Sequence, residues 1–266
     1  MSTTDTVKGT ALVTGASGGI GAVYADRLAR RGYDLVLVGR DTQRLQRVAH
    51  QIHEATGRAV EVASADLTVK PDQLRIERIL QTDERITLLV NNAGVGATLP
   101  LVDSDVDSLD RMIQLNVTAL TRLARAAAAA FVARGEGAII NIGSIAALAP
   151  EVLNGTYAGS KAFVLALSQS MHHELSPRGI KMQAVLPGAT STDFWNVAGV
   201  PVSSLPAAIV MNVEEMVDAA LVGFDRKELV TIPSLPEAAA WEAFDAARKA
   251  MGPGLSRSTA AARYKL

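Results

Sequence analysis

The chain has 266 residues, of which 48% are hydrophobic and 20% charged, so it can bury a sizeable core. Its formal net charge of −1 at pH 7 gives no basic footprint for nucleic acid or anionic lipid. It contains no cysteine, which excludes disulfides and thiolate metal sites. The first residues, 1–9, are polar and lack the apolar centre of a signal peptide, so we expect a cytoplasmic protein that does not bind membranes.

The first predicted element is a strand, Thr10–Thr14, that leads through a glycine-rich turn into a helix. The strand is apolar and β-branched, which is typical of a buried parallel strand. Several residues of the turn Gly15–Gly21 lack a Cβ atom, and the helical pattern Ala22–Arg31 follows directly. Unsatisfied N–H groups and the positive end of the helix dipole attract an anion there, so the junction predicts a pyrophosphate site.

Strand-like and helical runs alternate along the rest of the chain. The further predicted strands are Asp34–Gly39, Ala59–Ser64, Thr87–Asn91, Gly137–Ser144, Lys181–Leu186 and Leu229–Ile232. Alternation of this kind predicts an α/β fold, a doubly wound parallel sheet with helices on both faces. Because no linker, repeat or low-complexity segment interrupts it, we expect residues 1–266 to form a single domain.

A tyrosine and a lysine stand one turn apart on a predicted helix. Tyr157 and Lys161, at i and i+4, share a helix face with their Cβ atoms about 5–6 Å apart. An ammonium group favours a phenolate, so we expect Lys161 to lower the pKa of Tyr157 from its usual value of about 10. Ser144 ends the preceding predicted strand, from which its hydroxyl can hold a carbonyl oxygen against the phenol. The three side chains predict acid–base chemistry on a carbonyl group.

These motifs resemble the short-chain dehydrogenase/reductase family, in its single-domain branch. The likeness extends from Thr10 to about Ile232, in the family's order: Thr14-Gly15-xxx-Gly19-x-Gly21, Asp66-Leu67, Asn91-Asn92-Ala93-Gly94, Asn116, Ser144, Tyr157-xxx-Lys161 and Pro187-Gly188. The resemblance implies a Rossmann-type sheet of about seven strands in the order 3-2-1-4-5-6-7. It also implies an NAD(P)-dependent oxidoreductase.

The resemblance implies which residues bind the cofactor. They are Gly15, Ser17, Gly18, Gly19, Ile20, Gly21, Arg40, Asp66, Leu67, Asn92, Ala93, Gly94, Tyr157, Lys161, Pro187, Gly188, Thr190 and Thr192. Among them, Asp66 with the Leu67 backbone resembles the adenine contact, and residues 92–94 resemble the floor beneath the adenosine ribose. The segment 187–190, with Thr192 beside it, resembles the part that holds the nicotinamide carboxamide.

The end of the second predicted strand points to the preferred cofactor. Gly39 stands where NAD-dependent relatives carry an acidic residue, and Arg40 stands where a guanidinium binds the 2′-phosphate. Arg44 adds a second positive charge one turn onward, whereas the glycine turn has Ser17 where many NADP-dependent relatives are basic. We therefore expect NADP(H) to be preferred over NAD(H).

The resemblance also assigns catalytic roles. Tyr157 is expected to give its proton to the alkoxide that forms when hydride leaves the nicotinamide, while Ser144 orients the carbonyl. Lys161 is expected to bind the nicotinamide ribose as well. Asn116 resembles the family's helix-kinking asparagine, whose backbone carbonyl holds a water that links Lys161 to solvent.

The segment 193–212 is apolar for a connection and corresponds to the family's substrate lid. We expect Phe194 and Trp195, with Leu205, Ile209 and Met211, to wall a pocket for an apolar substrate. The alternative is that these side chains pack on the core or on a partner subunit. Further along, Pro236–Ala250 is predicted to form an amphipathic helix with Trp241 and Phe244.

Two histidines superficially suggest a metal site. His50 and His53 lie at i and i+3 on the second predicted helix, with Glu54 adjacent. The pattern offers no third ligand at a plausible position, so we interpret them as an exposed helix face and expect no metal.

The leading functional hypothesis is an NADPH-dependent reductase of ketones or aldehydes, working reversibly on a small, apolar molecule. One alternative is a reductase of carrier-linked 3-oxoacyl groups, with Arg122, Arg125 and Arg178 meeting an acidic carrier; another is a hydroxysteroid-type dehydrogenase. A third, from a different class, is a catalytically silent cofactor-binding regulator. We expect a homodimer or homotetramer through the helices Ser108–Arg134 and Tyr157–Leu175.

Overall fold

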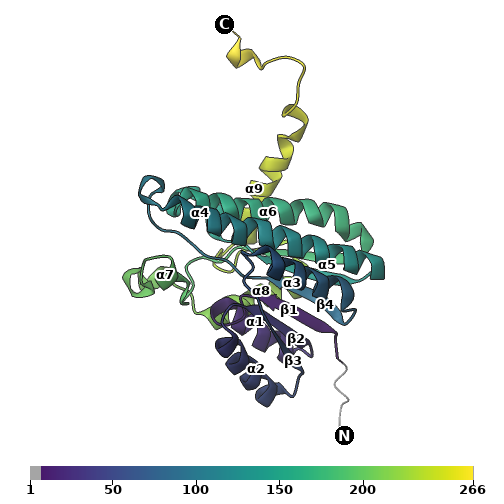
Figure 1. The fold of residues 1–266 in the computed structure, drawn as a ribbon. Helices are drawn as coiled ribbons and strands as arrows, with labels where there is room; N and C mark the ends of the chain where they lie inside the picture. Colours follow the sequence, from purple (N-terminus) through teal and green to yellow (C-terminus); the bar gives the residue numbers. More distant parts are fainter. Residues whose placement is uncertain (1–6, 266) are drawn as a thin grey trace. The chain divides into compact units, whose positions relative to one another are not determined.

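The structure is a computed structural model that describes residues 7–265 (Figure 1). Its first compact unit, which ends at Pro233, is built on a seven-stranded sheet in the order β3-β2-β1-β4-β5-β6-β7. All neighbouring strands run parallel. The strands are β1 (Thr10–Thr14), β2 (Asp34–Gly39), β3 (Val60–Ser64), β4 (Ile86–Asn91), β5 (Gly137–Ile142), β6 (Ile180–Val185) and β7 (Val230–Thr231). This confirms the predicted fold class and strand order.

One or two helices of this unit follow each of the first six strands. They are α1 (Gly19–Arg30), α2 (Thr42–Thr56), α3 (Lys70–Thr82), α4 (Val106–Ile113), α5 (Leu120–Arg134), α6 (Gly155–Leu175), α7 (Phe194–Val197) and α8 (Val213–Asp225). The caps of α2 show how local sequence sets these bounds. Asp41 accepts a hydrogen bond from Arg44 N at 2.9 Å before the helix begins, and Gly57 ends it in the left-handed conformation.

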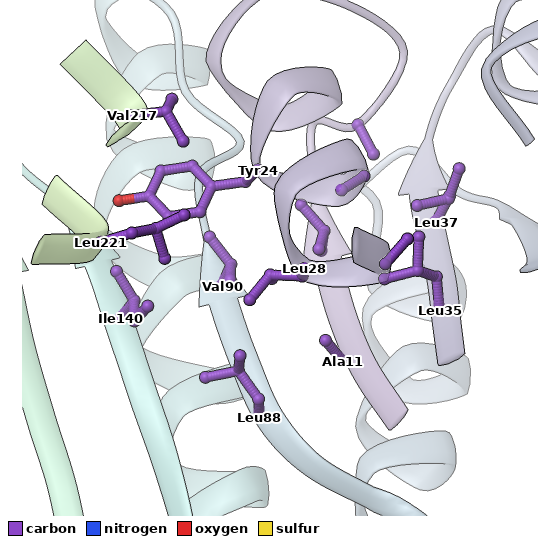
Figure 2. Close-up of a cluster of buried hydrophobic side chains, with 14 of the residues drawn as sticks. Ala11, Tyr24, Leu28, Leu35, Leu37, Leu88, Val90, Ile140, Val217 and Leu221 are labelled. Carbon is purple, nitrogen blue, oxygen red and sulfur yellow. The ribbon is translucent and has the colours of Figure 1, made fainter. Parts of the chain in front are cut away.

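One face of the sheet is covered by α1, α2 and α8. Tyr24 and Leu28 of α1 pack with Val217 and Leu221 of α8 above strand residues such as Val90 (Figure 2). These side chains are essentially inaccessible to solvent, so the strands beneath them are apolar on this face.

The opposite face is covered by α3, α5 and α6. Ile76 and Leu80 of α3, Phe131 of α5 and Met171 of α6 belong to one buried cluster with the strands. Alanine side chains on α5 allow that helix to approach the sheet closely. Among residues 7–265, no helix combines the length and the apolar character that crossing a bilayer requires.

A third, smaller cluster lies beyond the carboxyl ends of the strands. Leu109 and Met112 of α4 pack there with Tyr157 and Ala158 of α6, and Phe194 packs against them. The predicted acid–base tyrosine is thus held in an apolar surrounding at the edge where ligands bind in this fold.

Residues from Ser234 onward form a second compact unit. It contains α9 (Ala238–Ala250), which lies within the predicted helix Pro236–Ala250. The rings of Trp241 and Phe244, both on α9, contact each other in a tilted arrangement with their centroids 5.6 Å apart. The expectation of one domain over the whole chain stays a prediction.

Candidate active site

The turn between β1 and α1, which we call the cradle, is rich in glycine, so few side chains cover its backbone. Gly15 has a φ of +66°, and a Cβ atom there would lie 2.8 Å from Asn92 Nδ2. A Cβ atom on Gly21 would collide with the Gly15 carbonyl oxygen. Gly18 precedes α1 without a side-chain cap, and no acidic residue stands in the first turn. Because no side chain caps the start of α1, its N–H groups fit the pyrophosphate of a dinucleotide.

The residues after β4 lie beside this turn. Thr14 Oγ1 accepts hydrogen bonds from Asn92 N and Ala93 N, both at 3.0 Å. Asn92 Nδ2 donates in return to the Thr14 carbonyl oxygen at 2.9 Å. These bonds join the carboxyl ends of β1 and β4, where the crevice of a doubly wound sheet opens.

The ends of β2 and β3 carry Arg40, Asp66 and Leu67. Arg40 follows β2 directly and is exposed, so its guanidinium can meet a phosphate from solvent. Asp66 is half-buried, and its Oδ1 accepts from Thr68 N at 2.9 Å and from Thr68 Oγ1 at 2.7 Å. Leu67 is buried. Their roles toward the adenosine end of a cofactor stay predictions.

The helix α6 positions the tyrosine and the lysine. Asn154 caps it, and its Oδ1 accepts from Thr156 N at 2.9 Å and from Tyr157 N at 3.4 Å. Tyr157 therefore lies in a first turn that Asn154 holds in place, and Lys161 lies one turn further along the helix. The two side chains are 5% and 6% exposed. The Lys161 Nζ lies 5.8 Å from the centre of the Tyr157 ring.

Lys161 is a buried amine with a single backbone anchor among the described residues. Its Nζ donates to the Ile142 carbonyl oxygen, at the end of β5, at 3.0 Å. Burial disfavours the ammonium form and lowers the pKa of Lys161 to about 8. A Cβ atom on Gly94 would lie 3.5 Å from this Nζ, so the residues after β4 approach the amine closely.

The acidity of Tyr157 differs from the expectation. Burial raises the pKa of the Tyr157 phenol above its usual value, and the hydrogen bond with Ser144 opposes that shift. The predicted lowering by Lys161 is wrong for this structure, because burial disfavours the charged phenolate and the opposing effect comes from Ser144 instead of Lys161. The phenol is therefore protonated at neutral pH, as a proton donor must be.

Asn116 lies in the helical segment between α4 and α5, where the backbone hydrogen-bond pattern changes from α-helical to π-helical. Residues Gln114–Ala119 form a π-helical segment, a feature that is frequent at functional sites. The Asn116 side chain accepts from Val95 N at 3.0 Å and donates to the Val95 carbonyl oxygen at 2.9 Å. It also donates to Ser160 Oγ at 3.2 Å, which in turn donates to the Tyr157 carbonyl oxygen at 2.7 Å. Asn116 thus links the chain after β4 to the helix of the tyrosine.

The segment after β6 returns across the glycine turn. Pro187 is buried, and its carbonyl oxygen accepts from Ile145 N at 3.0 Å, next to Ser144. Thr190 Oγ1 donates to the Gly188 carbonyl oxygen at 3.1 Å. The Thr192 methyl carbon lies 3.3 Å from the place where Gly19 would carry a Cβ atom. The segment therefore faces the start of α1.

Phe194 and Trp195 lie near the start of the lid segment, which comprises residues 193–212. Their side chains occupy different places. The Phe194 ring lies 5.9 Å from the Tyr157 ring, between centroids, and packs on the backbone of Gly96. Trp195 is buried behind it, with its Nε1 donating to the Thr190 carbonyl oxygen at 3.0 Å. Phe194 is the better placed of the two to meet a substrate. Of the other predicted wall residues, Ile209 is 60% exposed.

Three features of the site were not predicted. Asn154 and Ser160 fix the first turn of α6, although an asparagine just before a helix and a serine within it are weak signals in one sequence. The third is an ion pair between Arg44 and Asp193 at 3.1 Å, which joins positions 149 residues apart. No local pattern signals such a contact.

Comparison with known proteins adds a family match. The profile of the short chain dehydrogenase family matches residues 9–199. A very-long-chain 3-oxoacyl-CoA reductase of Anas platyrhynchos is 37% identical over 193 residues, which are 71% of this chain and 62% of that protein.

Two solved structures are similar over almost the full chain. A short-chain dehydrogenase from Sphingobium yanoikuyae, in complex with NADPH, has 52% sequence identity and a TM-score of 0.94, covering 97% of this chain and 100% of its own. A bulky-bulky ketone specific alcohol dehydrogenase from Comamonas testosteroni has 47% identity and a TM-score of 0.90, with 98% and 100% covered.

Proposed function

The chain belongs to the short-chain dehydrogenase/reductase family and is an NAD(P)-dependent oxidoreductase, and from that premise we propose that it reduces apolar ketones to alcohols with NADPH. The observation that carries the proposal is the burial of Tyr157 one turn from Lys161. Burial raises the pKa of the phenol, with Ser144 opposing that shift, so Tyr157 keeps its proton at neutral pH. A neutral phenol in an apolar surrounding is suited to giving a proton to an alkoxide.

The chain's own residues would carry the proton chemistry. Nicotinamide supplies the hydride when the cofactor is bound. Ser144 hydrogen-bonds the substrate's carbonyl oxygen and holds it toward the Tyr157 hydroxyl, which then releases its proton to that oxygen. Lys161, with a pKa of about 8, is mostly an ammonium at pH 7 and stabilises the phenolate that remains.

The cradle between β1 and α1 fits a dinucleotide, and Arg40 supports a preference for the phosphorylated one. Gly39 leaves no carboxylate at the end of β2 to receive ribose hydroxyls, while the exposed Arg40 offers a planar donor pair to a 2′-phosphate. The NADPH bound by the Sphingobium relative supports the same preference.

The apolar surroundings of Tyr157 predict how the rate depends on substrate size. Each further methylene buried against Phe194 should contribute about 0.8 kcal/mol, or roughly fourfold in kcat/KM, until the pocket is full. Initial rates along a series of alkyl aryl ketones should therefore rise and then level. The Comamonas relative, a bulky-bulky ketone specific alcohol dehydrogenase, supports this substrate class.

Phe194→Ala should flatten that rise without changing the dissociation constant of NADPH. Phe224→Ala, which removes a partly buried ring of α8 outside the cluster around Tyr157, is the matched control and should leave the series unchanged. Trp195→Ala is less informative, because it also removes the hydrogen bond to Thr190. A flat series in the unmodified enzyme, or a preference for polyols, would contradict an apolar pocket.

Reduction of 3-oxoacyl thioesters is the second candidate, and the similarity to the Anas reductase favours it. The basic residues that we expected to contact an acidic carrier, which include Arg122, give this candidate less support. Arg122 is held by Glu77 in a short, partly buried ion pair, so its charge is already compensated. Comparing a 3-oxoacyl thioester with a ketone of equal carbon number separates the two candidates.

We also propose a homodimer or homotetramer built on α5 and α6. Phe163, on α6, is 37% exposed in the single chain, as a residue of an isologous contact would be. Light scattering at micromolar concentration should return two or four times the chain mass. Phe163→Glu should shift the mass toward a monomer, whereas Leu74→Glu, at a similarly exposed leucine of α3, should not. A monomer mass for the unmodified protein would contradict the assembly.

A further inference from the structure

An ion pair connects the cofactor side of the site to the lid segment. Arg44 lies in the first turn of α2, where its backbone N–H is held by Asp41. Its Nη2 lies 3.1 Å from Oδ2 of Asp193, the first residue of the lid segment. The two side chains are 43% and 74% exposed, so water and solutes can reach the pair.

The same guanidinium lies above the glycine turn. A Cβ atom on Gly18 would stand 2.8 Å from the Arg44 Nη2. A Cβ atom on the next residue, Gly19, would likewise contact the Thr192 side chain. The chain at 192–193 therefore crosses the start of α1, where the cofactor's phosphates are expected. The Asp193 carboxylate is the anion that this structure presents to Arg44.

Asp193 is also adjacent in sequence to Phe194, the residue that covers the proposed proton donor, Tyr157. It precedes α7 without making a side-chain capping bond, so its carboxylate is not needed to hold that helix. The next residue, Phe194, packs on the Tyr157 ring. A movement of Asp193 away from Arg44 would therefore shift the side chain that covers the proton donor.

From these contacts we propose that Asp193 is an internal substitute for the cofactor's 2′-phosphate on Arg44, and that binding of this phosphate releases the start of the lid segment. The inference rests on the proposed use of NADPH. Arg44 lies in the first turn of α2, shortly after Arg40, which favours the 2′-phosphate over the pyrophosphate as the competing group. A ligand shifts such an equilibrium only by its different affinity for the two states, and a phosphate competes with Asp193 only when the carboxylate is released.

Removing the competing carboxylate should strengthen binding of the phosphorylated cofactor. Because an exposed ion pair is weak, Asp193→Asn should lower the dissociation constant of NADPH by only about two- to fivefold and leave that of NADH unchanged. In an Arg44→Ala background the same substitution should have no effect on NADPH binding, since the guanidinium for which the carboxylate and the 2′-phosphate compete is then absent. Glu151→Gln, on the β5–α6 connection, removes one negative charge elsewhere and is the matched control.

The lid segment gives a readout that does not depend on catalysis. Hydrogen–deuterium exchange in residues 193–212 should be faster in Asp193→Asn than in the unmodified protein without any ligand. Adding 2′,5′-ADP to the unmodified protein should have the same effect, whereas ADP, which lacks a 2′-phosphate, should not.

Three results would overturn the inference: unchanged NADPH affinity in Asp193→Asn, an equal effect in the Arg44→Ala background, or equal release of the lid by ADP. Each of them can occur in an enzyme that reduces ketones with NADPH. An unmodified protein that binds neither NADPH nor 2′,5′-ADP would instead contradict the proposed function.

Discussion

Replacing Tyr157 by phenylalanine should lower kcat for ketone reduction by about 10²–10⁴-fold, the usual contribution of general acid catalysis. The substitution keeps the buried ring and its packing against Phe194 and removes only the hydroxyl that Ser144 contacts. The dissociation constant of NADPH, measured by fluorescence titration, should therefore change little. Rates and affinity measured on the same preparation separate loss of chemistry from loss of binding.

Tyr24 provides a matched control for that experiment. Its ring is fully buried between α1 and α8 (Figure 2), and among the described residues its hydroxyl has no hydrogen-bond partner. Tyr24→Phe removes the same atom from a tyrosine outside the site, so kcat should stay at the level of the unmodified enzyme. Retention of more than about a tenth of kcat in Tyr157→Phe would contradict the proton-donor role.

Arg40→Ala should raise the dissociation constant of NADPH by about ten- to a hundredfold, because a hydrogen-bonded charged partner contributes about 1.5–3 kcal/mol. The dissociation constant of NADH should barely change, since that cofactor has no 2′-phosphate. Calorimetric titration of both cofactors measures the two effects directly.

Arg178 offers the control for the removed charge. It is exposed and lies just before β6, at the amino end of a strand and away from the predicted crevice. Arg178→Ala should leave both cofactor affinities unchanged. An equal loss of NADPH and NADH affinity in Arg40→Ala would assign Arg40 a general structural role instead of phosphate recognition.

Most of the fold was predictable because apolar strands and glycine turns are local signals. The glycine turn after Thr14 and the alternation of strands with helices predicted the parallel sheet, and the resemblance supplied its strand order. Strand ends were less well predicted. Ser144 was expected to be the last residue of a strand that in fact ends at Ile142, because β-propensity does not show where the ladder of hydrogen bonds stops.

The electrostatics of the site could not be predicted in the same way. The spacing of Tyr157 and Lys161 indicates their proximity, but the direction of the Tyr157 pKa shift depends on how completely α4 and Phe194 cover the ring. The π-helical turn at Asn116 and the contact of Arg44 with Asp193 likewise depend on packing between distant segments. Such features appear only once the chain is folded.

The central claim is that this chain reduces apolar ketones with NADPH. Its most direct test is the ratio of kcat/KM for NADPH to that for NADH, measured with a saturating alkyl aryl ketone and purified protein. We expect steady turnover and a ratio of at least about ten, the lower bound of the phosphate contribution from Arg40. No turnover with either cofactor, or a ratio below one, would contradict the claim.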